Sequence, residues 1–312
     1  MLLSCVLLVV GMFLLIKGAD FFVDGSSKIA RFFKIPSLII GLTLVSMGTS
    51  APEASVSINA AINDLNDLSI GNVVGSNIFN TLLILGVSSI FTVLCVSKDM
   101  KKYDIPIMIF VYLVLILFSF VITPFRVDLI ESLIMLFLFV SYIIFLIFRA
   151  KKDKKVEEES EIKINIFTSV IFAVLGLAAI IFGGDLVVDS ASKIATKLGM
   201  SESLVGLTIV AVGTSLPELV TSVVASIKKE NDIAIGNVVG SNIFNVIFIL
   251  GLSSTISSLT LNSALLFDLI AMIVSGVLLL IFTLFSDKIN KKQGLLFILL
   301  YVAYIAYIII RN

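Results

Sequence analysis

A segment of eleven residues occurs twice in this chain, and this repeat constrains the fold more than any other feature. The segment IGNVVGSNIFN covers residues 70–80 and returns unchanged at residues 235–245. Each copy follows a Gly-Thr-Ser-x-Pro-Glu motif, so Glu218 lies 165 positions after Glu53, as Asn245 lies after Asn80. The chain is therefore an internal duplication in one register. The repeated polar residues sit among Leu, Ile and Val, where such groups are expensive, which makes them candidates for function.

The composition places the chain in a membrane. Hydrophobic residues make up 59% of its 312 residues and charged residues only 14%, whereas soluble proteins have about 45–50% and about 25%. We predict an all-α integral membrane protein with ten transmembrane helices, because a helix needs about 20 apolar residues to cross a bilayer. The predicted spans are 2–20, 35–59, 68–92, 104–122, 128–148, 164–187, 200–227, 233–257, 264–286 and 293–310.

Charge divides these spans into two units and orients them. The segment 151–163 (KKDKKVEEESEIK) is interpreted as a solvated cytoplasmic linker between a first repeat at 1–150 and a second at 164–312. Lys and Arg gather in the loops after odd-numbered spans, which the positive-inside rule assigns to the cytoplasm, so both termini are predicted to be extracellular. A repeat of five spans must enter the membrane from the side opposite to its copy. The two repeats are therefore predicted to be inverted, as in many secondary transporters.

Several function classes are disfavoured. The net charge is zero, so no nucleic-acid partner is indicated, and the expected surroundings are a lipid bilayer. The chain has no histidine, the commonest general base and metal ligand, and it lacks the Gly-x-Gly-Asp motif of an intramembrane protease. We therefore predict that it is not an enzyme.

The duplication has a purely structural alternative, in which it serves only to build a stable bundle. Glycines such as Gly71, Gly75, Gly236 and Gly240 would then allow close packing of the helices. For the oligomeric state, a monomer is our working hypothesis.

Polar residues at helical spacings of three and four mark the second span of each repeat and form one face. They are Ser46, Thr49, Ser50, Glu53 and Ser57 in the first copy, and Ala211, Thr214, Ser215, Glu218 and Ser222 in the second. Pro52 and Pro217 each remove a backbone N–H, so both helices are predicted to break there and to free carbonyl groups. Irregular backbone at this depth is tolerated where it lines a cavity.

The third spans add a second polar stripe, with residues at i, i+4 and i+8. They are Asn72, Ser76 and Asn80, and Asn237, Ser241 and Asn245. Carboxylate, amide, hydroxyl and carbonyl oxygens together suit calcium, which takes about 6–8 oxygen ligands, and they suit sodium as well. Soft metals would require sulfur or imidazole.

Other polar residues carry a plainer interpretation. Asn72, Asn77, Asn237 and Asn242 are equally compatible with hydrogen bonding between helices. Asp20, Asp24, Asp185 and Asp189 lie near the ends of the first span of each repeat, beside Lys28 or Lys193. We interpret these four as structural residues or as charges at the mouth of a pathway.

The paired GTSAPE (48–53) and GTSLPE (213–218) motifs, each followed by GNVVGSNIFN, resemble the alpha repeats of the calcium/cation antiporter superfamily, most closely its sodium/calcium exchanger branch. The resemblance implies a ten-helix fold that alternates between binding calcium and sodium at a midplane site, with no cofactor and a location in the cell membrane. By the same resemblance, Glu53 and Glu218 with the carbonyls of Thr49 and Thr214 would hold calcium, and Asn80 and Asn245 would complete the centre. The flanking sodium sites would comprise Ser50, Ser76, the Thr49 hydroxyl and the Ser46 carbonyl, and Ser215, Ser241, the Thr214 hydroxyl and the Ala211 carbonyl.

Differences from related patterns bear on the counter-ion. Asn245 stands where potassium-dependent exchangers have an aspartate, which argues against potassium. Val73, Val74 and Gly75 follow Asn72, where calcium/proton exchangers have a nearby glutamate, which argues against protons. The sequence thus favours sodium/calcium antiport, with calcium/proton exchange, potassium-dependent sodium/calcium exchange and a cation channel as alternatives.

Overall fold

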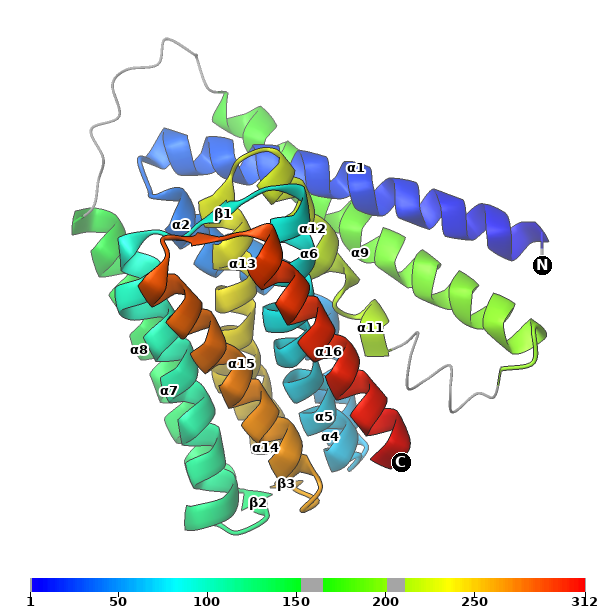
Figure 1. The fold of residues 1–312 in the computed structure, drawn as a ribbon, viewed down its shortest axis with the longest axis vertical. Coiled ribbons are helices and arrows are strands. Elements are labelled where there is room, and N and C mark those ends of the chain that lie inside the picture. The colour runs from blue at the N-terminus through cyan, green and yellow to red at the C-terminus, as the bar shows by residue number, and fades with distance from the viewer. Residues whose placement is uncertain (1, 153–164, 201–210, 312) are drawn as a thin grey trace.

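The computed structural model describes residues 2–152, 165–200 and 211–311, which form a bundle of helices joined by short turns and two-residue strands (Figure 1). The first half contains α1 (Leu2–Phe33), α2 (Ser37–Ile40), η1 (Gly41–Val45), α3 (Ser46–Thr49), α4 (Ala51–Ile62), α5 (Asn66–Ile78), η2 (Phe79–Ile84), α6 (Leu85–Phe91), β1 (Leu94–Cys95), η3 (Met100–Asp104), α7 (Ile105–Ile116), η4 (Leu117–Ile122), β2 (Arg126–Val127) and α8 (Leu129–Lys152). The second half contains α9 (Ile166–Lys197), α11 (Ala211–Gly213), α12 (Leu216–Ile227), α13 (Asn231–Phe244), η6 (Asn245–Leu250), α14 (Gly251–Ile256), β3 (Leu259–Thr260), α15 (Leu265–Phe285), β4 (Lys288–Ile289) and α16 (Lys291–Arg311). The η segments are π-helical turns.

Eight continuous helical stretches among the described residues are long and apolar enough to cross a membrane. Two shorter apolar helices, Ser37–Thr49 and Leu216–Ile227, lie within the predicted second and seventh spans. Residues 201–210 of the predicted seventh span, and residues 153–163 of the predicted linker, lie outside the described part of the chain. The structure therefore establishes a multi-pass helical membrane protein.

The first and sixth helices are longer than predicted. α1 and α9 have 32 residues each, about 48 Å at about 1.5 Å per residue, whereas the hydrocarbon core is about 30 Å thick. Lys28 and Arg31, which we expected in a loop, lie in the last turns of α1. Hydropathy marks where the membrane core ends, but a helix can continue beyond that point. α1 ends just before Pro36, because a proline disfavours helix in the residue that precedes it. α9 ends near Gly199, whose φ of +96° is a helix-ending conformation.

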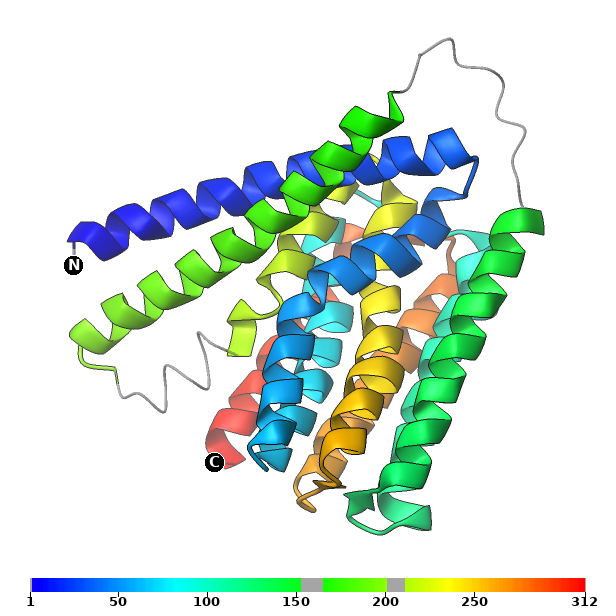
Figure 2. The ribbon, with the colours of Figure 1, turned by 180° about the vertical axis from the view of Figure 1, so that it is seen from behind.

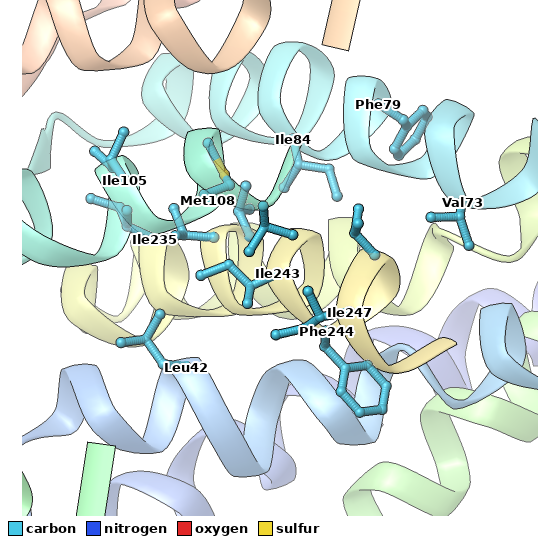
Figure 3. Close-up of a cluster of buried hydrophobic side chains, with 14 of the residues drawn as sticks. Leu42, Val73, Phe79, Ile84, Ile105, Met108, Ile235, Ile243, Phe244 and Ile247 are labelled. Atoms are coloured by element: carbon cyan, nitrogen blue, oxygen red, sulfur yellow. The ribbon is translucent and has the colours of Figure 1, made fainter. Parts of the chain in front are cut away.

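The third and eighth spans form the centre of the bundle. In the most apolar windows of α5–α6 and α13–α14, 78% and 89% of the residues are buried, compared with 22% in α1 and 17% in α16. Figure 3 shows Ile235, Ile243 and Ile247 between Leu42 and the side chains of Ile84 and Met108. The duplicated motif therefore lies on the two helices that are shielded best from lipid.

α1 and α9 pack side by side along their length and are inclined away from the other helices (Figures 1 and 2). The helices are antiparallel, because Gly11 meets Gly183 while Gly18 meets Gly176. A Cβ on Gly18 would stand 2.8 Å from the carbonyl oxygen of Gly176, and a Cβ on Gly176 would stand 2.7 Å from that of Gly18. Only glycine allows the backbones to approach this closely, as is common between membrane helices.

Two short antiparallel ribbons join the halves. β1 pairs with β4, with Leu94 opposite Ile289, and β2 pairs with β3, with Val127 opposite Leu259. Each ribbon takes one strand from each half of the chain, so the halves are joined at both ends of the bundle.

Candidate functional site

The site begins at a break in each glutamate-bearing helix. α3 ends at Thr49, Ser50 takes a non-helical ψ of 7°, and α4 begins at Ala51 with Pro52 in its first turn. The second half repeats this geometry: Ser215 has a ψ of 6°, and α12 begins at Leu216 with Pro217. The predicted breaks are thus present. Each break places a glutamate, Glu53 or Glu218, in the first turn of the following helix, where the free N–H groups favour negative charge.

The two glutamates are fully buried and exchange hydrogen bonds with the opposite half. Ser50 Oγ donates to Glu218 Oε1 at 2.9 Å, and Ser215 Oγ donates to Glu53 Oε1 at 2.9 Å. We call residues 165 positions apart twins. The two bonds are equivalent to each other, because Ser215 is the twin of Ser50 and Glu218 is the twin of Glu53. The contacts hold one oxygen of each carboxylate and bring both helix breaks to one place.

The asparagines at the start of the repeated motif brace the breaks. Asn72 Nδ2 donates to the Glu53 carbonyl at 3.2 Å and to Ser57 Oγ at 2.9 Å, and its twin Asn237 makes the matching bonds to Glu218 and Ser222 at 3.4 and 2.9 Å. Their Oδ1 atoms accept from threonine hydroxyls across the interface. Thr49 donates to Asn237 at 3.0 Å and Thr214 to Asn72 at 3.5 Å. The interhelical role considered for Asn72 and Asn237 is therefore present.

Serines from the third and eighth spans approach the opposite half. Ser215 Oγ donates to Ser76 Oγ at 3.1 Å, and Ser241 Oγ donates to the Ser46 carbonyl at 3.3 Å. This differs from the grouping we expected, in which Ser76 accompanied Ser46 and Ser241 accompanied Ser215. The close packing of α13 against η1 explains the second contact, since a Cβ on Gly240 would stand 2.8 Å from Leu42 Cα.

Two backbone carbonyls, those of Ser46 and Ala211, were expected to be ligands of the flanking sodium sites. The Ser46 carbonyl accepts the backbone N–H of Ser50 at 3.0 Å and the Thr49 hydroxyl at 3.3 Å, so it is already hydrogen-bonded. Ala211 is the first residue of α11 and borders the undescribed segment 201–210, and its contacts lie outside those described.

Asn80 and Asn245 lie in two of the π-helical turns, η2 and η6, and such turns often accompany functional sites. Both side chains are fully buried. Their Nδ2 atoms donate to Asn242 Oδ1 and Asn77 Oδ1, each at 3.1 Å. Among the described residues, their own Oδ1 atoms have no hydrogen-bond partner, and the same holds for Oε2 of Glu53 and Glu218.

Four buried oxygens without partners are costly, because a buried polar group that lacks a hydrogen bond destabilises a fold by about 1–3 kcal/mol and a charged one by more. All four belong to residues of the duplicated motifs. Two are carboxylate oxygens and two are amide oxygens, which are hard donors of the kind that calcium and sodium accept. The donor set therefore fits a hard cation.

A cavity of about 380 Å³ approaches this region from the α9 side. It lies between α4 and α9, and its lining includes Asp185, Asp189, Ser55, Thr214 and Pro217. Asp189 is within 4.0 Å of Lys193, as its spacing suggested. The acidic pair thus stands in the wall of a cavity that reaches a helix break.

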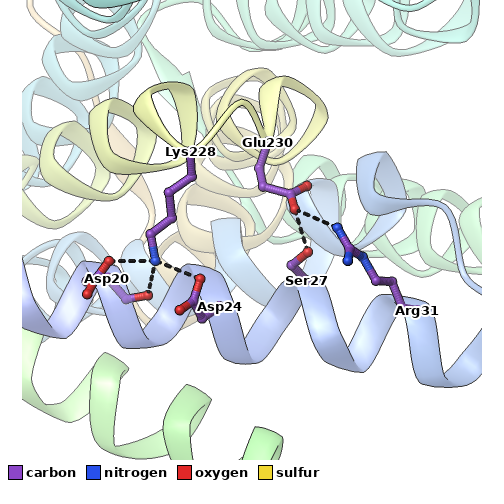
Figure 4. A network of polar contacts seen from close by, with 6 residues as sticks. All are labelled: Asp20, Asp24, Ser27, Arg31, Lys228 and Glu230. Carbon is purple, nitrogen blue, oxygen red and sulfur yellow. Dashed lines mark hydrogen bonds and ion pairs between the residues drawn. The ribbon is translucent and has the colours of Figure 1, made fainter. Parts of the chain in front are cut away.

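On the α1 side, the twins of Asp185 and Asp189 are Asp20 and Asp24, and this part of α1 makes charged contacts with the turn after α12, which we call the α1 latch (Figure 4). Lys228 Nζ lies 2.5 Å from Asp20 Oδ1 and 2.6 Å from Asp24 Oδ1, and Glu230 Oε1 accepts from Ser27 at 2.7 Å and from Arg31 at 3.3 Å. Lys28, which follows Asp20 and Asp24 by eight and four residues in the sequence, is not one of the residues of the latch, and its ammonium lies 5.7 Å from the centre of the Phe172 ring. Partial burial alone would lower the pKa of Lys228, but the hydrogen bonds and charges of Asp20 and Asp24 raise it above its usual value.

Comparison with known proteins identifies the family, since a model of the sodium/calcium exchanger protein family matches residues 3–148 and 168–310. The chain belongs to this family. It is 34% identical to the sodium/calcium exchanger MaX1 of Methanosarcina acetivorans, with 96% of each chain aligned. It is 36% identical to the putative antiporter CaxA of Alkalimonas amylolytica, over 97% of this chain and 98% of the relative. A solved structure of the sodium-calcium exchanger NCX_Mj superposes with a TM-score of 0.85 at 32% identity, over 97% of this chain and 98% of that one.

Membership in this exchanger family makes the chain a membrane transporter of the cation antiporter class rather than an enzyme. It supports the resemblance drawn from the GTSxPE and GNVVGSNIFN motifs. The ions that this chain transports and the residues that bind them must be inferred from the chemistry of its own site.

Proposed function

We propose that this protein exchanges sodium for calcium across the cell membrane by alternating access to a midplane site built on Glu53 and Glu218. The observation that carries the proposal is the set of four buried oxygens without partners, one from each glutamate and one each from Asn80 and Asn245. Two carboxylates and two neutral amides balance the charge of one calcium ion. A single sodium ion would leave one negative charge of the two carboxylates uncompensated, so more than one sodium ion would replace each calcium ion.

The flanking sodium sites are proposed to follow the contacts across the halves. Ser76, Ser215 and the Thr214 hydroxyl form one set of neutral oxygens, beside the expected Ala211 carbonyl. Ser241, Ser50, the Thr49 hydroxyl and the Ser46 carbonyl form the other. Each set adjoins one of the two glutamates through the bonds of Ser215 and Ser50.

Alternating access is proposed from the inverted five-helix repeats, 1–150 and 164–312, arranged as ten spans with both termini outside. In this structure α1 packs against α12, while a cavity lies between their twins, α9 and α4. Inverted repeats permit each half to adopt the arrangement of the other, which would close one side and open the other. The structure would then be one of the two states, closed between α1 and α12 and open between α9 and α4.

Ion-flux measurements in proteoliposomes test the function. Purified protein is reconstituted, and calcium-45 uptake is measured with an outward gradient of sodium, potassium or protons, each at clamped membrane potential. We expect uptake with the sodium gradient and none with the other two. Uptake driven equally by potassium or protons would replace sodium as the counter-ion.

A cation channel is the competing function, and it needs no counter-ion. Calcium entry into vesicles that contain only an impermeant cation would support a channel, while strict dependence on internal sodium supports the antiporter. The Glu53→Gln variant, reconstituted at the same protein density, serves as the blank because it lacks one of the two proposed carboxylates.

A further inference from the structure

Asn77 and Asn242 are twins in the repeated motif that the expected ligand set leaves out. Both are fully buried, one on α5 and the other on α13. Their amide oxygens accept hydrogen bonds from two of the expected ligands: Asn245 Nδ2 donates to Asn77 Oδ1, and Asn80 Nδ2 donates to Asn242 Oδ1. Each member of this pair thus contacts a ligand from the other half.

These bonds decide which end of each ligand amide is left without a partner. An asparagine side chain carries an oxygen acceptor and an NH₂ donor of nearly the same shape, so its orientation is set by its partners. Because Asn77 and Asn242 present oxygen to the ligand amides, they bind the NH₂ ends. The oxygens of Asn80 and Asn245 are left without partners, which is the arrangement that a cation requires.

The orienting residues are themselves held in place. Asn77 Nδ2 donates to the Asn242 carbonyl at 3.1 Å, and Asn242 Nδ2 donates to Thr81 Oγ1 at 2.8 Å. Thr81 Oγ1 in turn donates to the Asn77 carbonyl at 2.9 Å. With their own NH₂ groups engaged in this way, Asn77 and Asn242 cannot turn over without losing a buried bond, which costs about 1–3 kcal/mol.

We propose that Asn77 and Asn242 are positioning residues, which hold the amides of Asn245 and Asn80 with oxygen toward the transported cation. This inference rests on the proposed function, since it needs those amides to be ligands. Residues that orient a metal ligand typically change affinity by about 10–100-fold when they are replaced. We expect Asn77→Leu and Asn242→Leu to raise the KM for calcium by about tenfold or more.

A pair of second substitutions separates positioning from a structural role. Aspartate presents an oxygen in either orientation, so it needs no partner to choose between its ends. The effect of Asn77→Leu should therefore shrink to about threefold or less when residue 245 carries Asn245→Asp, and remain large when residue 80 carries Asn80→Asp. For Asn242→Leu the pattern reverses, with relief from Asn80→Asp and none from Asn245→Asp.

The experiment measures the KM for calcium in sodium-gradient-driven uptake for the full-length protein, the single variants and the four double variants. Thr283→Val is the matched control for a lost buried polar group, because Thr283 bonds the Leu280 carbonyl in its own helix, α15, and should leave KM unchanged. Asn77→Ala and Asn242→Ala provide a second series if the leucine variants fail to fold. The crossed pattern of relief supports the proposal.

Two outcomes overturn different claims. An equal loss in every background means that Asn77 and Asn242 only support the fold, and the positioning proposal fails while the site stands. If Asn80→Asp and Asn245→Asp alone leave the calcium and sodium dependence unchanged, the amides are not ligands, and the proposed site fails with it.

Discussion

α1 and α9 occupy twin positions in the two halves, but they contact the neighbouring helices differently. α1 is tied to the turn between α12 and α13 by Lys228 and Glu230. The twins of these two residues are Asn63 and Leu65, which carry no charge, and on that side a cavity separates α9 from α4. The centre shows the opposite behaviour, because the bonds of Glu53, Asn72 and Asn80 all recur in the other half. These three sets of bonds thus match between the halves at the centre, whereas the contacts differ where the pathway would open.

The largest expected effect tests the match at the centre. Glu53→Gln and Glu218→Gln should each reduce sodium-driven calcium uptake by about 100-fold or more, because removing one charge from a buried charged set costs about 3–5 kcal/mol. The losses should be equal within about threefold, since the two carboxylates have matching partners. Calcium-45 uptake at equal protein density measures both. Near-normal uptake by either variant would remove that glutamate from the site.

The serine hydroxyls give a smaller test of the same match. Ser50→Ala and Ser215→Ala each remove one hydrogen bond to the opposite glutamate, and bonds to charged groups contribute about 1.5–3 kcal/mol. We expect the KM for calcium to rise about tenfold or more in each variant. A tenfold difference between the two variants would show that the halves are not equivalent at the centre.

Asn245→Asp is expected to change ion coupling while the fold is retained. The substitution adds a negative charge at nearly constant volume, so the site should favour an additional monovalent cation. Reversal potentials of the reconstituted exchanger, measured at several sodium and potassium concentrations, should shift relative to the parent. Identical reversal potentials and potassium responses would mean that residue 245 does not contact the transported ions.

The latch gives the smallest expected effect and tests the difference at the edge. Lys228→Asn together with Glu230→Leu installs the twin residues, and partly exposed ion pairs contribute only about 0.2–1 kcal/mol each. We expect the KM for calcium on the latch side, which is cytoplasmic in the proposed orientation, to fall about two- to fivefold, because the closed arrangement of α1 and α12 loses support. Inside-out vesicles provide this measurement. Lys228→Arg, which keeps the charge, is the control and should resemble the parent.

The pH dependence of the latch follows from the raised pKa of Lys228. A group whose pKa is higher in the folded protein stabilises it fully below the ordinary lysine value of 10.5, and that contribution is lost as pH rises through the higher, folded-state value. The ratio of the KM for calcium between the parent and the variant with Lys228→Asn and Glu230→Leu should therefore stay constant from neutral pH to about pH 9. A difference that disappears within this range would show that another group governs the contact.

Local rules made much of this architecture predictable. Proline chemistry placed the breaks beside Glu53 and Glu218, and helical spacing placed Asn72, Ser76 and Asn80 on one helix. The exchange of partners between the halves was not predictable in detail. Spacing within one helix does not say whether Ser76 faces Ser50 or Ser215, and the structure brings it to Ser215.

The α1 latch could not be predicted from the sequence for another reason. In the sequence, Lys28 lies close to both acidic residues of α1, eight residues after Asp20 and four residues after Asp24. Their actual partner, Lys228, is more than two hundred residues distant in the chain. Asn77 and Asn242 were visible as repeated residues, but one asparagine looks like another until the acceptor of each amide is known.

The doubled contacts at the centre have the geometry of an isologous interface, in which residue i meets j and j meets i about a two-fold axis. One half of this chain therefore presents a surface that is complementary to its own copy, as the subunit of a symmetric dimer would. A dimer of identical subunits, however, must carry any latch on both faces or on neither. Joining the halves in one chain removes that obligation. Lys228 and Glu230 are the twins of Asn63 and Leu65, an asymmetry that two copies of one subunit cannot encode.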